Sequence, residues 1–281
     1  MPSFDRALPL RSRRWSGPSR IGRVARPFTI AHISDLHCGS PYFVPNLMDR
    51  AIIEVNDLEP DVVIVSGDLT TFGFRQEYVQ ARAYLDRIEC QDMIVVPGNH
   101  DSRNVGYVHF EEQFGARQQV LRKDGVCMLA IDSSEPDLDH GVVGRSRYPW
   151  IRQEFAEPAR LRIFILHHHL LPIPGTGRER NVVYDAGDAL EVLAASGCRL
   201  VLSGHKHVPH AWRLEDLFVV NAGTVSTLRT RGKGRPCYNV VEVHDDRVAV
   251  LRAYPFHERD RILEFSLTTL DHRKWPGHEG S

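Results

Sequence analysis

Five short polar blocks stand out in the sequence, and each one follows an apolar run. The blocks are Asp35-Leu36-His37, Gly67-Asp68, Gly98-Asn99-His100-Asp101, His167-His168-His169 and Gly204-His205-Lys206-His207. If the apolar runs are strands, every block lies at the carboxyl end of a strand. The loops at that edge of an open α/β sheet converge on one crevice. We therefore expect the five blocks to meet at a single site.

The residue types in these blocks are those of a transition-metal site. Asp and Asn offer oxygen and His offers imidazole nitrogen, a mixture that suits first-row metals better than calcium. No cysteine belongs to the set, which argues against a purely structural zinc site. Some seven ligands are too many for one tetrahedral ion, but they fit two ions that share a carboxylate. Two ions ~3.5–4 Å apart can hold the attacking and departing oxygens of an in-line displacement, which predicts phosphoryl chemistry.

The order of the blocks carries more information than any block alone. An Asp-x-His triplet or a Gly-Asp pair is common, and such residues usually cap helices or form turns. All five blocks in this order, each at the end of an apolar run, are specific to a metal site.

The segments that must position the blocks are short strands separated by helices. We expect strands at 28–33, 62–65, 93–96, 126–131, 163–166, 200–202 and 218–220. These runs do not alternate with polar residues, which is typical of strands covered on both faces. Helical patterns occupy 46–58, 76–88, 150–155 and 185–195. The sequence therefore predicts the α/β class.

The pattern changes after Tyr238. Two apolar segments, 238–243 and 248–254, are separated by only a few polar residues, which predicts an antiparallel hairpin. We expect three regions: an Arg-rich, loose N-terminal segment (1–27), one catalytic domain (28–270) and a loose polar tail (271–281).

Composition excludes several classes of protein. The chain has 281 residues with a formal net charge of −1, which argues against a nucleic-acid partner. No stretch approaches the ~18 apolar residues of a membrane span. The five cysteines are odd in number and form no Cys-x-x-Cys pair, which indicates free thiols in a reducing compartment. We therefore expect a cytoplasmic protein.

Residues 1–28 hold seven arginines and one acidic residue, Asp5. They contain no apolar core of a secretory signal. Two alternatives remain: a basic arm that makes peripheral contact with anionic lipid or nucleic acid, and a loose lead-in segment. We favour the second. Four arginines lie in polar loops where they could hold a second phosphate, although solvated charges are the commoner case: Arg145, Arg147, Arg178 and Arg180.

The series Asp-x-His, Gly-Asp, Gly-Asn-His-Asp, His and Gly-His-x-His resembles the calcineurin-like metallophosphoesterase superfamily, over about 28–221. Within it, the chain is most similar to the class III cyclic-nucleotide phosphodiesterases. The resemblance implies a four-layer α-β-β-α sandwich with two mixed sheets. It also implies two metal ions, with iron, manganese, zinc and cobalt as candidates.

The resemblance also implies a role for each residue of the blocks. The first ion would take Asp35, His37 and His207, and the second Asn99, His167 and His205. Asp68 would bridge both ions. His100 would face the phosphate as general acid, and Asp101 would orient His100 by a hydrogen bond. His168 competes with His167 as the ligand, because relatives often read His-His-Pro here; we favour His167, which directly follows the strand.

The expected reaction is hydrolysis of a small phosphate ester by a metal-bridging hydroxide, with His100 protonating the leaving group. A 3′,5′-cyclic nucleotide or another small diester is the first substrate candidate. The alternatives are a phosphomonoesterase, or a hydrolase of nucleotide or lipid pyrophosphates, with the same metals. A non-catalytic interaction scaffold is the alternative of another class, but every ligand type is retained. The sequence does not determine the oligomeric state.

Overall fold

The computed structural model describes residues 26–176, 182–231, 234–269 and 271–275. Most of the Arg-rich segment 1–27 and the last six residues of the polar tail lie outside these ranges. The predicted looseness and membrane contact of the Arg-rich segment therefore concern residues outside the described part. Arg178 and Arg180 also lie outside it.

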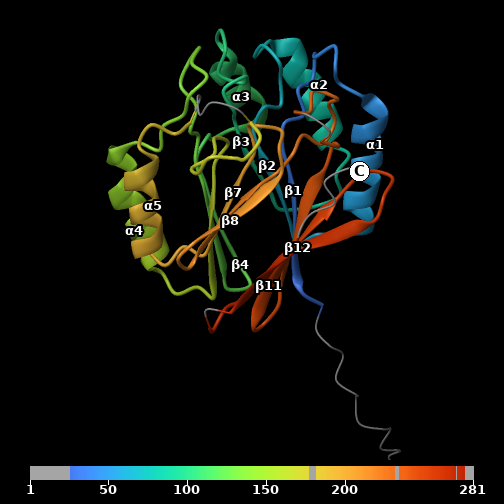
Figure 1. Cartoon of the computed structure of the whole chain (residues 1–281). Helices are drawn as coiled ribbons and strands as arrows, with labels where there is room; N and C mark the ends of the chain where they lie inside the picture. The colour runs from blue at the N-terminus through green and yellow to red at the C-terminus, as the bar shows by residue number, and fades with distance from the viewer. Residues whose placement is uncertain (1–25, 177–181, 232–233, 270, 276–281) are drawn as a thin grey trace, which may run out of the picture.

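Helices and strands alternate through most of the chain and give way to strands alone near its end (Figure 1). The elements are β1 (Phe28–Ile33), α1 (Pro45–Asp57), β2 (Val62–Ser66), α2 (Arg75–Leu85), β3 (Met93–Val96), α3 (Gly106–Phe114), β4 (Gln119–Lys123), β5 (Val126–Ala130), the 3₁₀ helix η1 (Arg145–Arg147), α4 (Tyr148–Ala156), β6 (Leu161–Ile165), α5 (Ala186–Ala195), β7 (Leu200–Ser203), β8 (His210–Leu214), β9 (Leu217–Asn221), β10 (Tyr238–Val243), β11 (Arg247–Ala253), β12 (Arg259–Ser266) and β13 (His272–Lys274). None of the helices in the described ranges is long and apolar enough to cross a bilayer.

Two mixed sheets form the centre of the protein. The first has the strand order β13-β12-β11-β10-β1-β2-β3, and the second has the order β4-β5-β6-β7-β9-β8. In the first sheet β1, β2 and β3 are parallel, whereas β10 pairs with β1 in the antiparallel direction. The predicted hairpin is confirmed, since β10 and β11 pair in the antiparallel direction.

Both faces of the central strands are buried, as the unbroken apolar runs predicted. In β2, Val62 and Ile64 belong to the core between the two sheets, whereas Val63 and Val65 belong to the core under α1 and α2. Successive side chains of a strand point to opposite faces, so one apolar run serves two cores. A third core lies between the second sheet and the helices α4 and α5.

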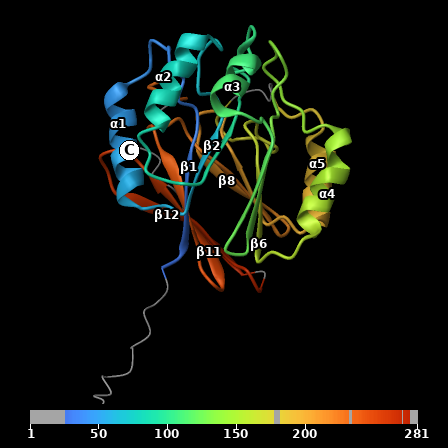
Figure 2. The same ribbon diagram turned by 180° about the vertical axis from the view of Figure 1, so that it is seen from behind.

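The layers are therefore helix, sheet, sheet and helix, which confirms the predicted four-layer fold. Figure 1 shows α1 and α2 on one side of the paired sheets and α4 and α5 on the other, and Figure 2 shows the same arrangement from behind. The carboxyl ends of the parallel strands of both sheets meet at one rim, where the loops with the polar blocks emerge.

Some elements differ from the sequence prediction. Helix α3 and strands β4, β8, β12 and β13 were not predicted. The expectation of a loose tail after Leu270 is wrong for His272–Lys274, which form β13 and pair with β12. These three side chains are exposed and polar, so the strand is held by backbone hydrogen bonds that leave no apolar pattern in the sequence.

Candidate metal centre

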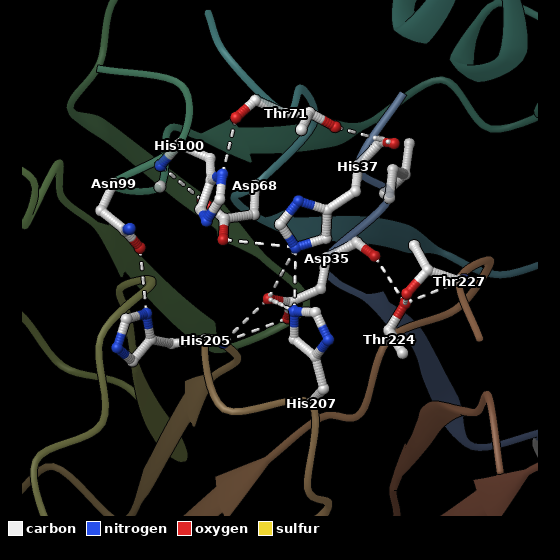
Figure 3. Close-up of polar contacts among 12 residues, drawn as sticks. Asp35, His37, Asp68, Thr71, Asn99, His100, His205, His207, Thr224 and Thr227 are labelled. Carbon is white, nitrogen blue, oxygen red and sulfur yellow. Dashed lines mark hydrogen bonds and ion pairs between the residues drawn. The ribbon is translucent and has the colours of Figure 1, made fainter. Parts of the chain in front are cut away.

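The predicted ligands come together as two groups of donor atoms that share one carboxylate. Asp35, His37, Asp68 and His207 each place a donor atom within 4.8 Å of the others. A second group with the same spacing consists of Asp68, His167 and His205. Asp68 thus belongs to both groups, as a bridging ligand would. Figure 3 shows most of these side chains pointing toward one another.

Asn99 joins the second group through its side-chain oxygen. Asn99 Oδ1 lies 3.0 Å from His205 Nδ1, and the same nitrogen lies 3.3 Å from His167 Nε2. All seven residues proposed as ligands therefore lie in one cluster at the rim, although they come from five separate loops.

The backbone of these loops is held in an unusual conformation. Five of the residues have positive φ: Asp35 (56°), His37 (53°), Asp68 (53°), His205 (78°) and His207 (56°). The left-handed region costs a residue with a side chain of order 1–3 kcal/mol, and such residues cluster at functional sites.

Two glycines allow the loops to approach so closely. A Cβ on Gly98 would overlap the Asp68 carboxylate, and a Cβ on Gly204 would overlap the side chains of Ser34 and Asp35. The glycines in the Gly-Asn-His-Asp and Gly-His-x-His blocks are therefore required by packing around the carboxylates.

Backbone carbonyls fix the orientation of two imidazoles. His167 Nδ1 donates to the Ser66 carbonyl oxygen at 2.7 Å, and His207 Nδ1 donates to the Arg229 carbonyl oxygen at 2.6 Å. With the proton on Nδ1, the lone pair is on Nε2, and Nε2 is the atom that faces the cluster. A hydrogen bond to the far ring nitrogen is the usual way in which proteins orient a metal-binding histidine.

The first donor group brings imidazole nitrogens and carboxylate oxygens close together, with few hydrogen atoms between them. His37 Nε2 lies 2.8 Å from His207 Nε2 and 3.5 Å from Asp68 Oδ2. His207 Nε2 lies 3.3 Å from Asp35 Oδ1. At most one proton fits between the two imidazole nitrogens. The remaining lone pairs of the imidazole nitrogens and carboxylate oxygens point into a small volume. This donor set fits a cation.

The pKa values indicate the same demand for positive charge. Burial lowers the pKa of His37 to about 3, so this ring is neutral at pH 7, as a metal ligand must be. Burial also opposes protonation of His167, but Asp68 outweighs it and raises the pKa of His167 to about 9. Burial alone would raise the pKa of Asp68, yet His167 and His100 hold it well below its usual value. The buried carboxylate thus stabilises a positive charge beside it.

The ring of His100 is oriented differently from the prediction. His100 Nδ1 donates to the Thr71 carbonyl oxygen at 2.7 Å (Figure 3). The carboxylate of Asp101 instead accepts from the backbone of Leu69 at 3.0 Å and of Thr70 and Gly98, both at 2.9 Å. The predicted hydrogen bond from Asp101 to His100 is therefore wrong. Asp101 closes the loop that carries Asp68, because its oxygens are taken by backbone donors.

Comparison with known proteins agrees with the fold. The sequence profile of the calcineurin-like phosphoesterases matches residues 28–209. The chain belongs to the calcineurin-like phosphoesterase family. This membership confirms the predicted enzyme class, a metal-dependent hydrolase of phosphate esters.

Two relatives and one solved structure show what the chain is similar to. The chain is 26% identical to a probable cyclic nucleotide phosphodiesterase of Rhodococcus erythropolis over 63% of its own length and 64% of that protein. It is 28% identical to a cAMP/cGMP dual specificity phosphodiesterase of Mycobacterium tuberculosis, over 82% of this chain and 80% of that one. A purple acid phosphatase from yellow lupin has a similar fold, with a TM-score of 0.64 and 14% identity over 83% of this chain and 53% of that one.

The histidine tract of the phosphoesterase divides its three rings between different tasks. His167 enters the donor cluster, whereas His168 Nδ1 lies 2.9 Å from Ser133 Oγ. The His168 ring centroid lies 4.7 Å from that of His205, and the His169 ring stacks on His205 at 5.5 Å. The geometry thus favours His167 as the ligand, and the next two rings support His205.

A cavity of about 370 Å³ opens over the cluster. Sequence reasoning missed part of its lining, namely Arg103, Asp139, Arg229, Thr230 and Arg231. Arg103 follows the Gly-Asn-His-Asp block by only two residues, so its proximity was predictable. The segment 229–231 carries no motif, and only the fold brings it beside His207.

Arg145 and Arg147, which could have held a second phosphate, make contacts away from the cavity. Arg145 pairs with Asp188 at 2.9 Å, and Arg147 donates to the Val143 carbonyl oxygen at 2.6 Å. Neither side chain lines this cavity in the described part of the chain.

Proposed function

We propose that this phosphoesterase hydrolyses a small phosphodiester, with a 3′,5′-cyclic nucleotide as the first candidate, at a centre that binds two metal ions. The observation that carries the proposal is the pair of donor groups sharing Asp68. The names of the relatives from Rhodococcus and Mycobacterium support the choice of a cyclic diester.

The chain would divide the ions between its two donor groups. Asp35, His37 and His207 would hold the first ion and Asn99, His167 and His205 the second, with Asp68 on both. Oxygen and imidazole donors accept iron, manganese, zinc or cobalt. When bound, such ions act as Lewis acids and make water nucleophilic near neutral pH.

His100 would act on the leaving group. It lines the cavity, and its ring lies edge-on to His37 with 4.7 Å between centroids. Because Nδ1–H is held by the Thr71 carbonyl, Nε2 is the atom that can carry a proton to the departing oxygen. General acid catalysis of this kind contributes ~10²–10⁴ in rate.

The substrate would be a small molecule. A cavity of about 370 Å³ is in the range of small-ligand sites.

All five cysteines are unpaired, which agrees with the sequence prediction and is consistent with the proposed cytoplasmic location.

The test combines metal analysis with a substrate panel. Purified protein, loaded with manganese, is assayed on cyclic nucleotides, linear diesters, phosphomonoesters and nucleotide pyrophosphates. We expect two ions per chain and the highest kcat/KM on a diester. Asp68→Asn should lose both ions, whereas the control Asp216→Asn, at an exposed turn, should keep them. Highest activity on a monoester or a pyrophosphate would replace the diester by that substrate. Protein that takes up no metal and hydrolyses nothing would instead be a scaffold.

A further inference from the structure

The cavity over the donor cluster has an excess of positive charge at one wall. Outside the cluster and His100, its charged lining residues are Arg103, Asp139, Arg229 and Arg231. Arg103 Nη2 and Asp139 Oδ1 form an ion pair at 2.9 Å, so their charges offset each other. Arg229 and Arg231 form no ion pair with any residue in the described ranges, which leaves two uncompensated guanidinium groups.

These two arginines lie on a loop that is anchored at several points. Arg229 N donates to Thr227 Oγ1 at 3.2 Å, and the Arg229 carbonyl accepts from His207 at 2.6 Å. Arg231 Nε donates to the Lys206 carbonyl oxygen at 3.2 Å. The backbone of Arg229 and the side chain of Arg231 are thus tied to the Gly204–His207 loop, and both residues line the cavity.

The wall formed by this loop is separate from the wall that carries His100. Figure 3 shows His100 and Asn99 on one side of the cluster and His207 on another. The Arg229 carbonyl oxygen accepts a hydrogen bond from His207. The donor cluster and His100 already supply the groups for the phosphate that is hydrolysed. Neither arginine has an acidic partner in the described ranges, so both are available to pair with an anion in the cavity. The guanidinium fork suits the oxygens of a phosphate.

We propose that Arg229 and Arg231 form a subsite for a second phosphate group of the substrate, distinct from the one that is hydrolysed. This inference rests on the proposed diesterase function and narrows its substrate class. Among otherwise identical diesters, the one with an additional phosphate is the preferred substrate.

A pair of matched substrates tests the subsite. The p-nitrophenyl esters of thymidine 5′-phosphate, with and without a 3′-phosphate, share the scissile bond and leaving group and differ only in the second anion. We expect the wild-type kcat/KM to be about 10- to 100-fold higher with the 3′-phosphate, the range for charge-assisted hydrogen bonds. The double variant Arg229→Ala/Arg231→Ala should lose this preference, so that its kcat/KM becomes nearly equal on the two esters. The control Arg152→Ala, at an exposed position of α4, should keep it.

A binding experiment separates this inference from the proposed function. Calorimetry compares thymidine 3′,5′-bisphosphate with thymidine 5′-phosphate on the wild type and the double variant. Tighter binding of the bisphosphate by the wild type alone supports the subsite even if neither ester is hydrolysed, and in that case only the diesterase proposal fails. Turnover of both esters with equal kcat/KM, or equal losses on both in the double variant, overturns the subsite.

Discussion

Replacing His100 with alanine separates proton donation from metal binding. The backbone N–H of His100 donates to Asp68 Oδ1 at 2.9 Å, and alanine keeps that bond. The side chain donates a hydrogen bond to the Thr71 carbonyl oxygen and lies beside His37, so its removal takes away a proton donor and leaves the seven proposed ligands in place. Two diesters distinguish the outcomes. In cyclic AMP the leaving group is a ribose oxygen, an alkoxide that needs a proton. Bis-p-nitrophenyl phosphate instead releases p-nitrophenolate, a stable anion.

The expected loss in kcat is about 10²–10⁴ on cyclic AMP and much less on the p-nitrophenyl ester. That loss corresponds to roughly 2.7–5.4 kcal/mol of transition-state stabilisation, at about 1.36 kcal/mol per factor of ten. The assay is steady-state kinetics at saturating manganese, with metal content measured on the same samples. Equal losses on both esters at unchanged metal content would refute the acid assignment. A variant that loses metal would show instead that the Asp68 loop depends on the His100 ring.

Further predictions address the metals, the packing and the pH dependence of stability. Asn99→Ala should weaken the second ion only, so metal titration should show one site kept, and loss of both would contradict the division of ligands. Gly204→Ala should lower the free energy of unfolding by roughly 1–3 kcal/mol through overpacking against Asp35, whereas Gly187→Ala, whose Cβ meets nothing within 4 Å, should not destabilise the protein; chemical denaturation compares them. Burial raises the pKa of Asp185, but hydrogen bonds from Tyr148 and two backbone amides lower it by more than burial raises it. The pKa in the folded protein is therefore below the unfolded value. Its stabilisation is therefore present above about pH 4 and lost as the pH falls through the folded value; the stability difference between wild type and Asp185→Asn should shrink there, and a difference that stays constant down to pH 3 would count against the assignment.

The sequence was most informative where strands are buried on both faces. A run such as Val62 to Val65 has no alternative to a central strand, and the polar residues that follow it must lie at the rim. The edge elements lacked this information. Strand β8 (His210–Leu214) is partly exposed, and β13 has three exposed polar residues, so neither has an apolar pattern. Helix α3 is short and buries little beyond Phe110.

The error at Asp101 has a physical origin. Adjacent residues in a turn point in different directions, so proximity in sequence to His100 did not imply contact. Besides the nearby Gly98 amide, the donors to Asp101 are the backbone amides of Leu69 and Thr70 and the Thr70 hydroxyl, 32 and 31 residues away in the sequence. Only the fold brings that loop to the carboxylate. A hydrogen bond from a distant backbone amide to a carboxylate cannot be predicted from the type of the donor residue, because every non-proline residue offers the same N–H.

This arrangement gives Asp101 a structural task that bears on the metals. Burial, with Asp68 nearby, raises the pKa of Asp101 to about 7, and hydrogen bonds from backbone amides and from the Thr70 hydroxyl favour its charged form. Those donors belong to the loop that follows Asp68 and to Gly98, beside which the Asp68 carboxylate packs. Asp101 therefore ties together two of the five loops at the residue that both donor groups share. The Gly-Asn-His-Asp block thus contributes in three ways: Asn99 as a proposed ligand, His100 as a proposed proton donor, and Asp101 as the residue that holds the loop after Asp68 in place.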